Sequence, residues 1–314
     1  MHPLSHADVR TAADRIAGHV RPVTIAPGDH GGASLALELM QHTGSFKARG
    51  ALNFLLAHRE AGTLPSAGVT IASGGNAGLA CAWAARGQDV RATVFLPATA
   101  PKVKVDRLLD YGADVRLTGT EYAEALAACE EFAAETGALA SHAYDHPLIA
   151  AGAGTLFEEI HDRMPGLDTI VVSVGGGGLV AGIATAARAH GVRVVAVEPE
   201  NCRALHAALE AGRPVDVTVD SVAADSLGAR RASAAALHAA GQDHVRSVLV
   251  PDAAIVRARL ALWADRRLAV EHAAATAYAA VGEAYRPEPG ERVCVVLCGS
   301  NTDPSDLVQG LTRT

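Results

Sequence analysis

The sequence contains very little lysine. Among 314 residues there are three lysines against twenty-four arginines, and the formal net charge is −7. The basic residues are scattered, so the chain has no electrostatic surface that would predict nucleic-acid binding. No apolar run reaches membrane length, and the start MHPLSHADVR lacks the apolar core of a signal peptide. We therefore expect no membrane association and a cytoplasmic location.

Paired cysteines are also missing. The five cysteines are an odd number and include no CxxC pair, which argues against a disulfide framework or a zinc knuckle. We expect them to be reduced thiols, mostly buried as small apolar side chains. The length and the 49% hydrophobic content suit one large domain or two linked ones. The cysteines are Cys81, Cys129, Cys202, Cys294 and Cys298.

The commonest local pattern is an amphipathic helix, a glycine and then a short apolar strand. Each glycine suits the left-handed position just after a helix, and the spacing leaves room for crossover helices. This pattern is typical of parallel α/β sheets. It occurs in WAARGQDVRATVFL, LLDYGADVRL, AAETGALASHAY and ARAHGVRVVAVE.

The predicted strands form two groups along the chain. We interpret them as two lobes with a cleft between them: a large lobe of residues 1–67 plus 146–314, and a small lobe of residues 68–145. The irregular segment 211–228 is expected to be a loop near the cleft. The strands of the first group are expected at 69–73, 92–96, 113–117 and 138–142, and those of the second at 169–174, 192–198, 246–250 and 292–298.

Lys47 stands in HTGSFKARG, where small residues precede it and KARGALNFLLA predicts a helix start. A desolvated lysine can lose its proton and form an imine with an aldehyde, whereas an arginine stays charged. Phe46 can pack beside a flat ring. The pattern favours an aldehyde cofactor on Lys47, with an ordinary surface lysine as the alternative.

Four consecutive glycines in VSVGGGGLVAG lie between a predicted strand and a predicted helix. Their N–H groups at a helix N-terminus favour phosphate. A flexible turn is one alternative, and a dinucleotide-binding unit ending at Glu198 is another. In the latter the GxGxxG spacing fails, because Val180 or Ala181 stands where the third glycine belongs.

A third strand-to-helix junction, IASGGNAGLA, carries two glycines between polar side chains. Gly74 and Gly75 leave N–H groups free, while Ser73 and Asn76 add hydrogen-bonding side chains. Such a nest suits a carboxylate or a phenolate oxygen, although an ordinary tight turn is an alternative.

Together GSFKARG, SGGNAG, VGGGGL and LCGSN, in this order, resemble the fold type II pyridoxal-phosphate enzymes, and most closely the serine/threonine dehydratases, also called ammonia-lyases. The resemblance extends from about residue 20 to residue 307. It implies an α/β fold of two lobes with parallel or mixed sheets flanked by helices, as in the β subunit of tryptophan synthase.

The resemblance also implies roles for particular residues. Lys47 would link to pyridoxal 5'-phosphate and move protons, Phe46 would pack by its ring, Asn76 would bond the ring phenol oxygen, and Glu271 would lie near the ring. Cys298 would face the pyridine nitrogen. The phosphate would be held by Gly175, Gly176, Gly177 and Gly178, and the substrate carboxylate by Ser73, Gly74, Gly75, Asn76 and Ala77.

The implied reaction is β-elimination of L-threonine or L-serine to a 2-oxo acid and ammonia. The alternatives are another β-hydroxy amino acid, β-replacement, an NAD-dependent dehydrogenase, and a silent relative that only binds ligands. AYDHP at 143–147 departs from the family's usual loop and leaves the substrate open. Gly74 stands where racemases of this fold carry a serine, which favours elimination. Resemblance favours a homodimer.

A metal site of some relatives is expected to be absent. It begins at the glutamate that Glu198 matches, but the second acidic ligand falls at Ala204, whose side chain cannot bind a hard cation.

Overall fold

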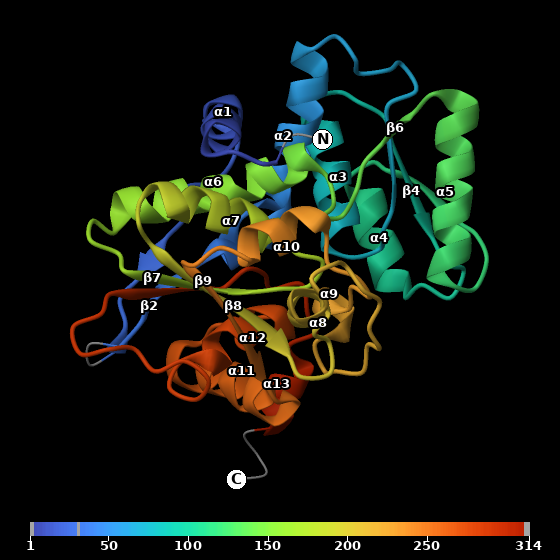
Figure 1. The fold of residues 1–314 in the computed structure, drawn as a ribbon. Coiled ribbons are helices and arrows are strands. Elements are labelled where there is room, and N and C mark those ends of the chain that lie inside the picture. The colour runs from blue at the N-terminus through green and yellow to red at the C-terminus, as the bar shows by residue number, and fades with distance from the viewer. Residues whose placement is uncertain (1–2, 30–31, 311–314) are drawn as a thin grey trace.

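The computed structural model describes residues 3–29 and 32–310, and it contains two β-sheets with helices packed on them (Figure 1). The larger sheet has six strands in the order β1-β2-β10-β7-β8-β9, in which only the β1–β2 pair is antiparallel. These strands are β1 (Ile25–Ala26), β2 (Ser34–Ala36), β7 (Thr169–Ser173), β8 (Arg193–Pro199), β9 (Val245–Val250) and β10 (Val293–Val296).

The smaller sheet is parallel throughout and has the order β5-β4-β3-β6. Its strands and the helices between them come from one continuous stretch of chain, on the right in Figure 1. They are β3 (Val69–Ala72), α3 (Asn76–Gly87), β4 (Ala92–Leu96), α4 (Lys102–Asp110), β5 (Asp114–Leu117), α5 (Tyr122–Thr136) and β6 (Leu139–Ala140).

Helices cover both faces of the larger sheet (Figure 1). One face carries α6 (Pro147–Arg163), α7 (Gly178–Ala189) and α10 (Ala234–Ala240), and the other carries α11 (Asp252–Arg266), α12 (His272–Ala280) and α13 (Ser305–Gly310). The central strand β7 is buried along its whole length, as expected for a strand covered on both faces. The remaining helices are α1 (His6–Ile16), α2 (Lys47–Glu60), α8 (Ala204–Ala211) and the short α9 (Ala224–Leu227), with 3-10 turns at Glu38–Met40 and His42–Gly44.

The predicted fold class is confirmed, and each predicted strand overlaps an observed one. Strands β1 and β2 were not predicted, because they contain only two and three residues. The prediction that Gly87 takes the left-handed position just after a helix was wrong. Gly87 is the last residue of α3, and the positive φ falls on Asp89, at 53°. The predicted boundaries of the two lobes stay a prediction.

The five cysteines all lie buried and free, at positions that bring no two of them into a disulfide. Within residues 3–29 and 32–310, no helix combines the length and the apolar character needed to cross a lipid bilayer.

A buried ion cluster anchors the beginning of α2. The side chain of Arg49 is fully buried, and its guanidinium donates to Glu38 at 2.6 and 3.1 Å and to Glu159 at 2.6 and 3.2 Å. Two carboxylates around one guanidinium satisfy a charge that would otherwise be very costly inside the protein. Because Arg49 lies two residues after Lys47, the cluster fixes where Lys47 enters the helix.

We predict that Arg49→Met lowers the free energy of unfolding by about 3–5 kcal/mol, because it leaves the buried Glu38 without its counter-charge. Urea unfolding of the cofactor-loaded protein measures the change. Arg59→Ala, on the exposed end of the same helix, is the matched control and should change stability little. Equal effects of the two substitutions would contradict the role given to the cluster.

Candidate active site

Three loops that follow strands β3, β7 and β10 meet between the two sheets. Asn76, after β3, contacts Glu271 from the large lobe, and Ser173 at the end of β7 lies beside Cys298 after β10, with Oγ and Sγ 3.6 Å apart. The Phe46 N–H donates to the Cys298 carbonyl at 3.0 Å, which brings the start of α2 to the same place. Sites at the carboxyl ends of parallel strands are the usual location of ligands in α/β folds.

The backbone before Lys47 turns sharply. Thr43 and Gly44 have positive φ values of 62° and 73°, and Ser45 then pairs as an isolated bridge with Gly299. A left-handed conformation is uncommon for a threonine, so the surrounding contacts must maintain it. This turn delivers Lys47 as the first residue of α2, facing the ends of the strands.

The amine of Lys47 lies in a weakly solvated position. It donates to the Ala143 carbonyl at 2.7 Å and lies 4.8 Å from the centre of the Phe46 ring. Burial lowers the pKa of Lys47 to about 8, although Cys298 and Glu271 act in the opposite direction. A neutral amine is therefore present in a substantial fraction near pH 8, which is the form that attacks a carbonyl.

Two further groups at the site are shifted toward their neutral forms. Burial raises the pKa of the Cys298 thiol to about 12, so the thiol stays protonated at neutral pH. Burial also raises the pKa of Glu271 to about 7, against the lowering effect of the Asn76 amide. Desolvation thus acts on Lys47, Cys298 and Glu271 together, as in many active sites.

Asn76 is held in place by two neighbours. Its Nδ2 donates to both carboxylate oxygens of Glu271 at 3.0 Å, and its Oδ1 accepts from Asn301 Nδ2 at 2.6 Å. Asn301 also donates to the Thr43 carbonyl at 2.7 Å. This network joins the first turn of α3 to the loop before Lys47. A side chain at Gly299 would collide with it, since a Cβ there would lie 2.4 Å from Glu271 Oε1.

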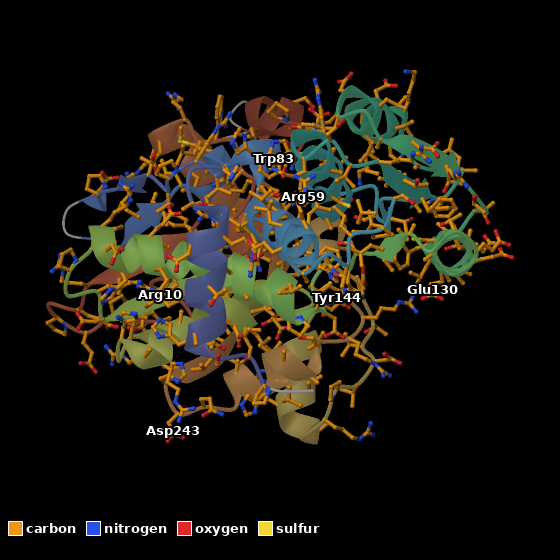
Figure 2. All side chains as sticks on the ribbon, turned by 90° about the horizontal axis from the view of Figure 1, so that it is seen from above. Arg10, Arg59, Trp83, Glu130, Tyr144 and Asp243 are labelled. Atoms are coloured by element: carbon orange, nitrogen blue, oxygen red, sulfur yellow. The ribbon has the colours of Figure 1, made fainter. Side chains whose placement is uncertain are left out.

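Three of the four glycines after β7 lie so close to neighbouring residues that a side chain would not fit. Cβ atoms would lie 2.4 Å from the Tyr144 ring at Gly176, 2.2 Å from Ala236 Cβ at Gly177, and 2.9 Å from the Tyr144 carbonyl at Gly178. Gly177 also has a φ of 98° and caps α7, so its conformation favours glycine. Tyr144 lies on the segment that leads into α6 (Figure 2). Free N–H groups at the start of α7 complete an anion site.

The loop from Ser73 to Ala77 also leads directly into a helix. Gly75 caps α3, and the Gly75 N–H points to Ser73 Oγ at 3.4 Å. Gly78 is required by close approach, because a Cβ there would lie 1.8 Å from the Ser73 carbonyl oxygen. A pocket is lined by Gly74, Gly75 and Asn76, which follow β3, and by residues from later in the chain, namely Asp225, Ser226, Glu271 and Asn301.

The side chain of Glu198 is hydrogen-bonded to the backbone at the start of α8. Both of its carboxylate oxygens accept from backbone N–H groups of α8, at 2.8 Å from Leu205 and 2.8 Å from His206. Glu198 thus caps the N-terminus of α8, where the helix dipole favours negative charge. Ala204, the position of the second acidic ligand in some relatives, is buried at the beginning of the same helix.

The donor set fits a phosphorylated aldehyde with an aromatic ring. Lys47 supplies the amine, the glycines after β7 supply an anion cradle, and Phe46 supplies an apolar surface. In addition, the hydroxyl oxygens of Thr43 and Ser45 are buried with no hydrogen-bond partner among the described residues. Both hydroxyl groups are therefore available to form a hydrogen bond with a ligand beside Lys47. Fold and site together fit a protein that uses such a cofactor.

Comparison with known proteins agrees. Residues 26–299 match the family described as "Pyridoxal-phosphate dependent enzyme". The chain is 37% identical over 311 residues to the L-threonine ammonia-lyase of Geobacter sulfurreducens, covering 96% of this chain and 76% of the relative. It is 35% identical to the phenylserine dehydratase of Ralstonia pickettii, covering 88% and 84%. The maize serine racemase structure superimposes with a TM-score of 0.89 at 27% identity, covering 99% and 98%.

The chain therefore belongs to the pyridoxal-phosphate-dependent enzyme family, with the fold type II architecture. The predicted family and cofactor are confirmed. The structure brings together Phe46, Lys47, Asn76, Glu271 and Cys298, while the individual roles of the site residues stay predictions. Sequence reasoning missed the tie between Asn301 and Asn76 and the Ala143 carbonyl that accepts from Lys47. Asn301 could have been found, since it ends the LCGSN motif.

We predict that covalent capture of added pyridoxal phosphate by cofactor-free protein becomes faster as the pH rises and is half-maximal near pH 8. The lowered pKa of Lys47, about 8, makes the neutral amine available there rather than near the ordinary value of 10.5. Stopped-flow absorbance measures the rate, and Lys47→Arg should show no capture at any pH. A midpoint near pH 10 would show that burial does not control this amine.

Proposed function

We propose that this enzyme dehydrates and deaminates a β-hydroxy amino acid, with L-threonine or L-serine as substrate and a 2-oxo acid and ammonia as products. The observation that carries the proposal is the pair of Lys47, an amine with a pKa of about 8, and Cys298, a thiol that stays neutral. The similarity to an L-threonine ammonia-lyase over 96% of the chain supports it.

In the proposed arrangement each part of the cofactor has a residue of this chain to hold it. Phe46 would pack on the ring, Asn76 would bond its phenol oxygen, and Cys298 would face its nitrogen. The phosphate would be held through the backbone N–H groups of Gly175, Gly176, Gly177 and Gly178. When bound, pyridoxal phosphate supplies an electron sink for the bond that breaks at the substrate α-carbon.

Lys47 then acts as the base. Its neutral amine accepts the α-proton at Nζ, and Ala143, whose carbonyl accepts from Nζ at 2.7 Å, helps to orient it. Cys298 contributes by remaining uncharged. A thiol with a pKa of about 12 does not impose protonation on a facing nitrogen as an aspartate would, which favours prompt loss of the β-hydroxyl.

The substrate carboxylate is proposed to bind the loop Ser73, Gly74, Gly75, Asn76 and Ala77. Gly74, Gly75 and Asn76 of this loop line the pocket, and the loop leads into the positive end of α3. Helix dipole and free N–H groups suit a carboxylate here. Glu271, with a pKa raised to about 7, can exchange a proton near Asn76 within the physiological range.

Two neighbouring activities remain candidates. The similarity to a phenylserine dehydratase favours a second substrate class, β-hydroxy amino acids with larger side chains. The likeness to the maize serine racemase raises racemisation, which needs an acid or base on the face opposite Lys47. Gly74, expected from resemblance to occupy that position, has no side chain to serve. β-Replacement has no such observation in its favour, and the family membership disfavours the nicotinamide alternative.

We also propose a homodimer and a cytoplasmic location. The homodimer rests on the resemblance to the dehydratases, and the location on the sequence alone. Sedimentation of the loaded enzyme tests the first, and fractionation of the source cells tests the second.

We predict that the loaded enzyme releases a 2-oxo acid from L-threonine or L-serine and forms no D-serine from L-serine. A screen of β-hydroxy amino acids with 2-oxo acid detection, followed by chiral chromatography, measures both. Lys47→Ala should abolish release. Substantial D-serine from the unaltered enzyme would overturn the one-face role of Lys47, and 2-oxo acid only from bulky substrates would assign the second class.

We predict that Cys298→Ser retains most activity, while Cys298→Asp loses a large part of it. Serine keeps a small neutral group at the pyridine nitrogen, whereas the negative charge of an ionised aspartate would stabilise the protonated nitrogen, and the ring would then retain electrons. Steady-state kinetics and the absorbance of the bound cofactor measure the outcome. If Cys298→Ser is inactive although fold and cofactor are intact, the thiol has another role.

A further inference from the structure

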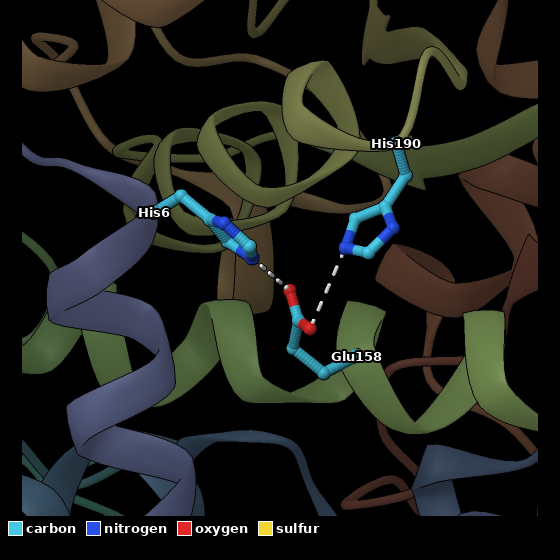
Figure 3. Close-up of side chains that lie close together, drawn as sticks. All are labelled: His6, Glu158 and His190. Atoms are coloured by element: carbon cyan, nitrogen blue, oxygen red, sulfur yellow. Dashed lines mark hydrogen bonds and ion pairs between the residues drawn. The ribbon is translucent and has the colours of Figure 1, made fainter.

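A second group of chemically competent side chains lies on the large lobe, far from Lys47. His6, Glu158 and His190 come from the first turn of α1, from α6 and from the end of α7, and their side chains converge (Figure 3). His6 Nε2 lies 2.9 Å from Glu158 Oε1, and His190 Nε2 lies 3.6 Å from Glu158 Oε2. One potential ligand atom from each of the three lies within 4.8 Å of the others.

These separations suit a single small cation. With metal–ligand bonds of about 2.0–2.2 Å, tetrahedral ligands lie roughly 3.3 Å from one another. The observed 2.9 and 3.6 Å are close to that value, but they involve different oxygens of Glu158. One potential ligand atom from each residue lies within 4.8 Å of the others, so side-chain rotations would complete the geometry. Two imidazoles with one carboxylate favour zinc or a similar divalent transition metal over calcium or magnesium, which prefer oxygen ligands.

One ring nitrogen of this group, His190 Nε2, is available to bind a metal ion. His190 Nε2 is buried and has no hydrogen-bond partner among the described residues, although the rest of the ring is partly exposed. Glu158 is almost fully buried, with 9% of its side chain exposed. The His161 ring packs against His190 at 4.1 Å between centroids. His6 also lines a surface cavity of about 420 Å³.

Arg10 is the main competitor for Glu158. Its Nη1 lies 3.6 Å from Glu158 Oε2, but 59% of its side chain is exposed (Figure 2 shows Arg10 from above). An exposed ion pair of this kind contributes little, so the guanidinium can move into solvent when a divalent cation arrives. Arg10 therefore weakens metal binding without preventing it.

We propose that His6, Glu158 and His190 form a binding site for one zinc ion that fastens α1 to α6 and α7. The site is distinct from the position of Glu198, which caps α8. It lies at the end of α7 opposite the glycines that begin this helix. Twelve helical residues separate the two ends, a length of about 18 Å. The zinc thus acts on the stability of the lobe and not on the reaction at Lys47.

The test uses tag-free, cofactor-loaded enzyme that has been stripped with a chelator and titrated with zinc against a chromophoric competitor. We expect one equivalent to bind. His190→Ala and Glu158→Gln should each weaken binding at least about 100-fold, because loss of a direct ligand costs no less than loss of an outer partner. His238→Ala, an exposed histidine on the wall of the same cavity, is the matched control and should bind as the parent does.

Two further measurements separate a metal site from a simple ion-pair cluster. Arg10→Ala should tighten zinc binding, by up to about fivefold, because it removes the competitor of the metal. Zinc should also raise the melting temperature of the parent and of His238→Ala but not of His190→Ala. Equal zinc affinity in the parent and His190→Ala, or weaker affinity in Arg10→Ala, would leave an ion-pair cluster only and overturn the proposal.

Discussion

The close packing of α2 on α6, and of α6 on α7, sets the geometry on which the active site depends. Glycines stand at both contacts, and an added Cβ would lie 2.2–2.8 Å from the backbone of the facing helix at Gly50, Gly152, Gly154 and Gly182. Helices can approach so closely only where side chains are absent. Since α2 begins at Lys47 and α7 begins at the glycines that we propose to bind phosphate, these contacts fix the distance between the amine and those glycines. The Arg49 cluster then prevents α2 from sliding along α6.

Desolvation, more than charge pairing, determines the electrostatics of the site. Burial is the largest influence on the pKa of Lys47, Glu271 and Cys298 alike, and each shifts toward its neutral form. The upward direction of the pKa shift of Glu271 has a consequence for the stability of the fold. Its raised pKa means that the folded protein holds this proton more tightly than the unfolded chain, so its contribution is fully present at low pH and is lost as the pH rises through about 7. The contribution of Glu271 is thus lost at a lower pH than the one at which the Lys47 amine, with a pKa of about 8, becomes neutral.

The sequence allowed the fold class and the site loops to be predicted, because both depend on local patterns. Glycines between strand and helix mark the turns at Gly74 and Gly175, and the single lysine among small residues marks Lys47. What escaped prediction depends on distant contacts. The Arg49 cluster joins residues 110 positions apart, and the Lys47 contact with the Ala143 carbonyl spans 96 positions, so neither leaves a local pattern. The prediction that Gly87 takes the left-handed conformation failed because another residue near a helix end can take it. Here that residue is Asp89.

In the reaction that we propose, the absence of a side chain at Gly74 favours elimination over racemisation, and the structure adds a second residue to that proposal. A Cβ at Gly74 would lie 2.5 Å from Leu96 Cδ2, and Leu96 is almost completely buried at the end of β4. A serine at this position therefore needs a smaller or displaced neighbour at residue 96 before its hydroxyl can serve as an acid or base. Gly74 and Leu96 form a coupled pair, and single substitution at Gly74 tests packing as much as chemistry. In the proposed reaction, the packing of Leu96 would therefore restrict which face of the substrate this chain can protonate.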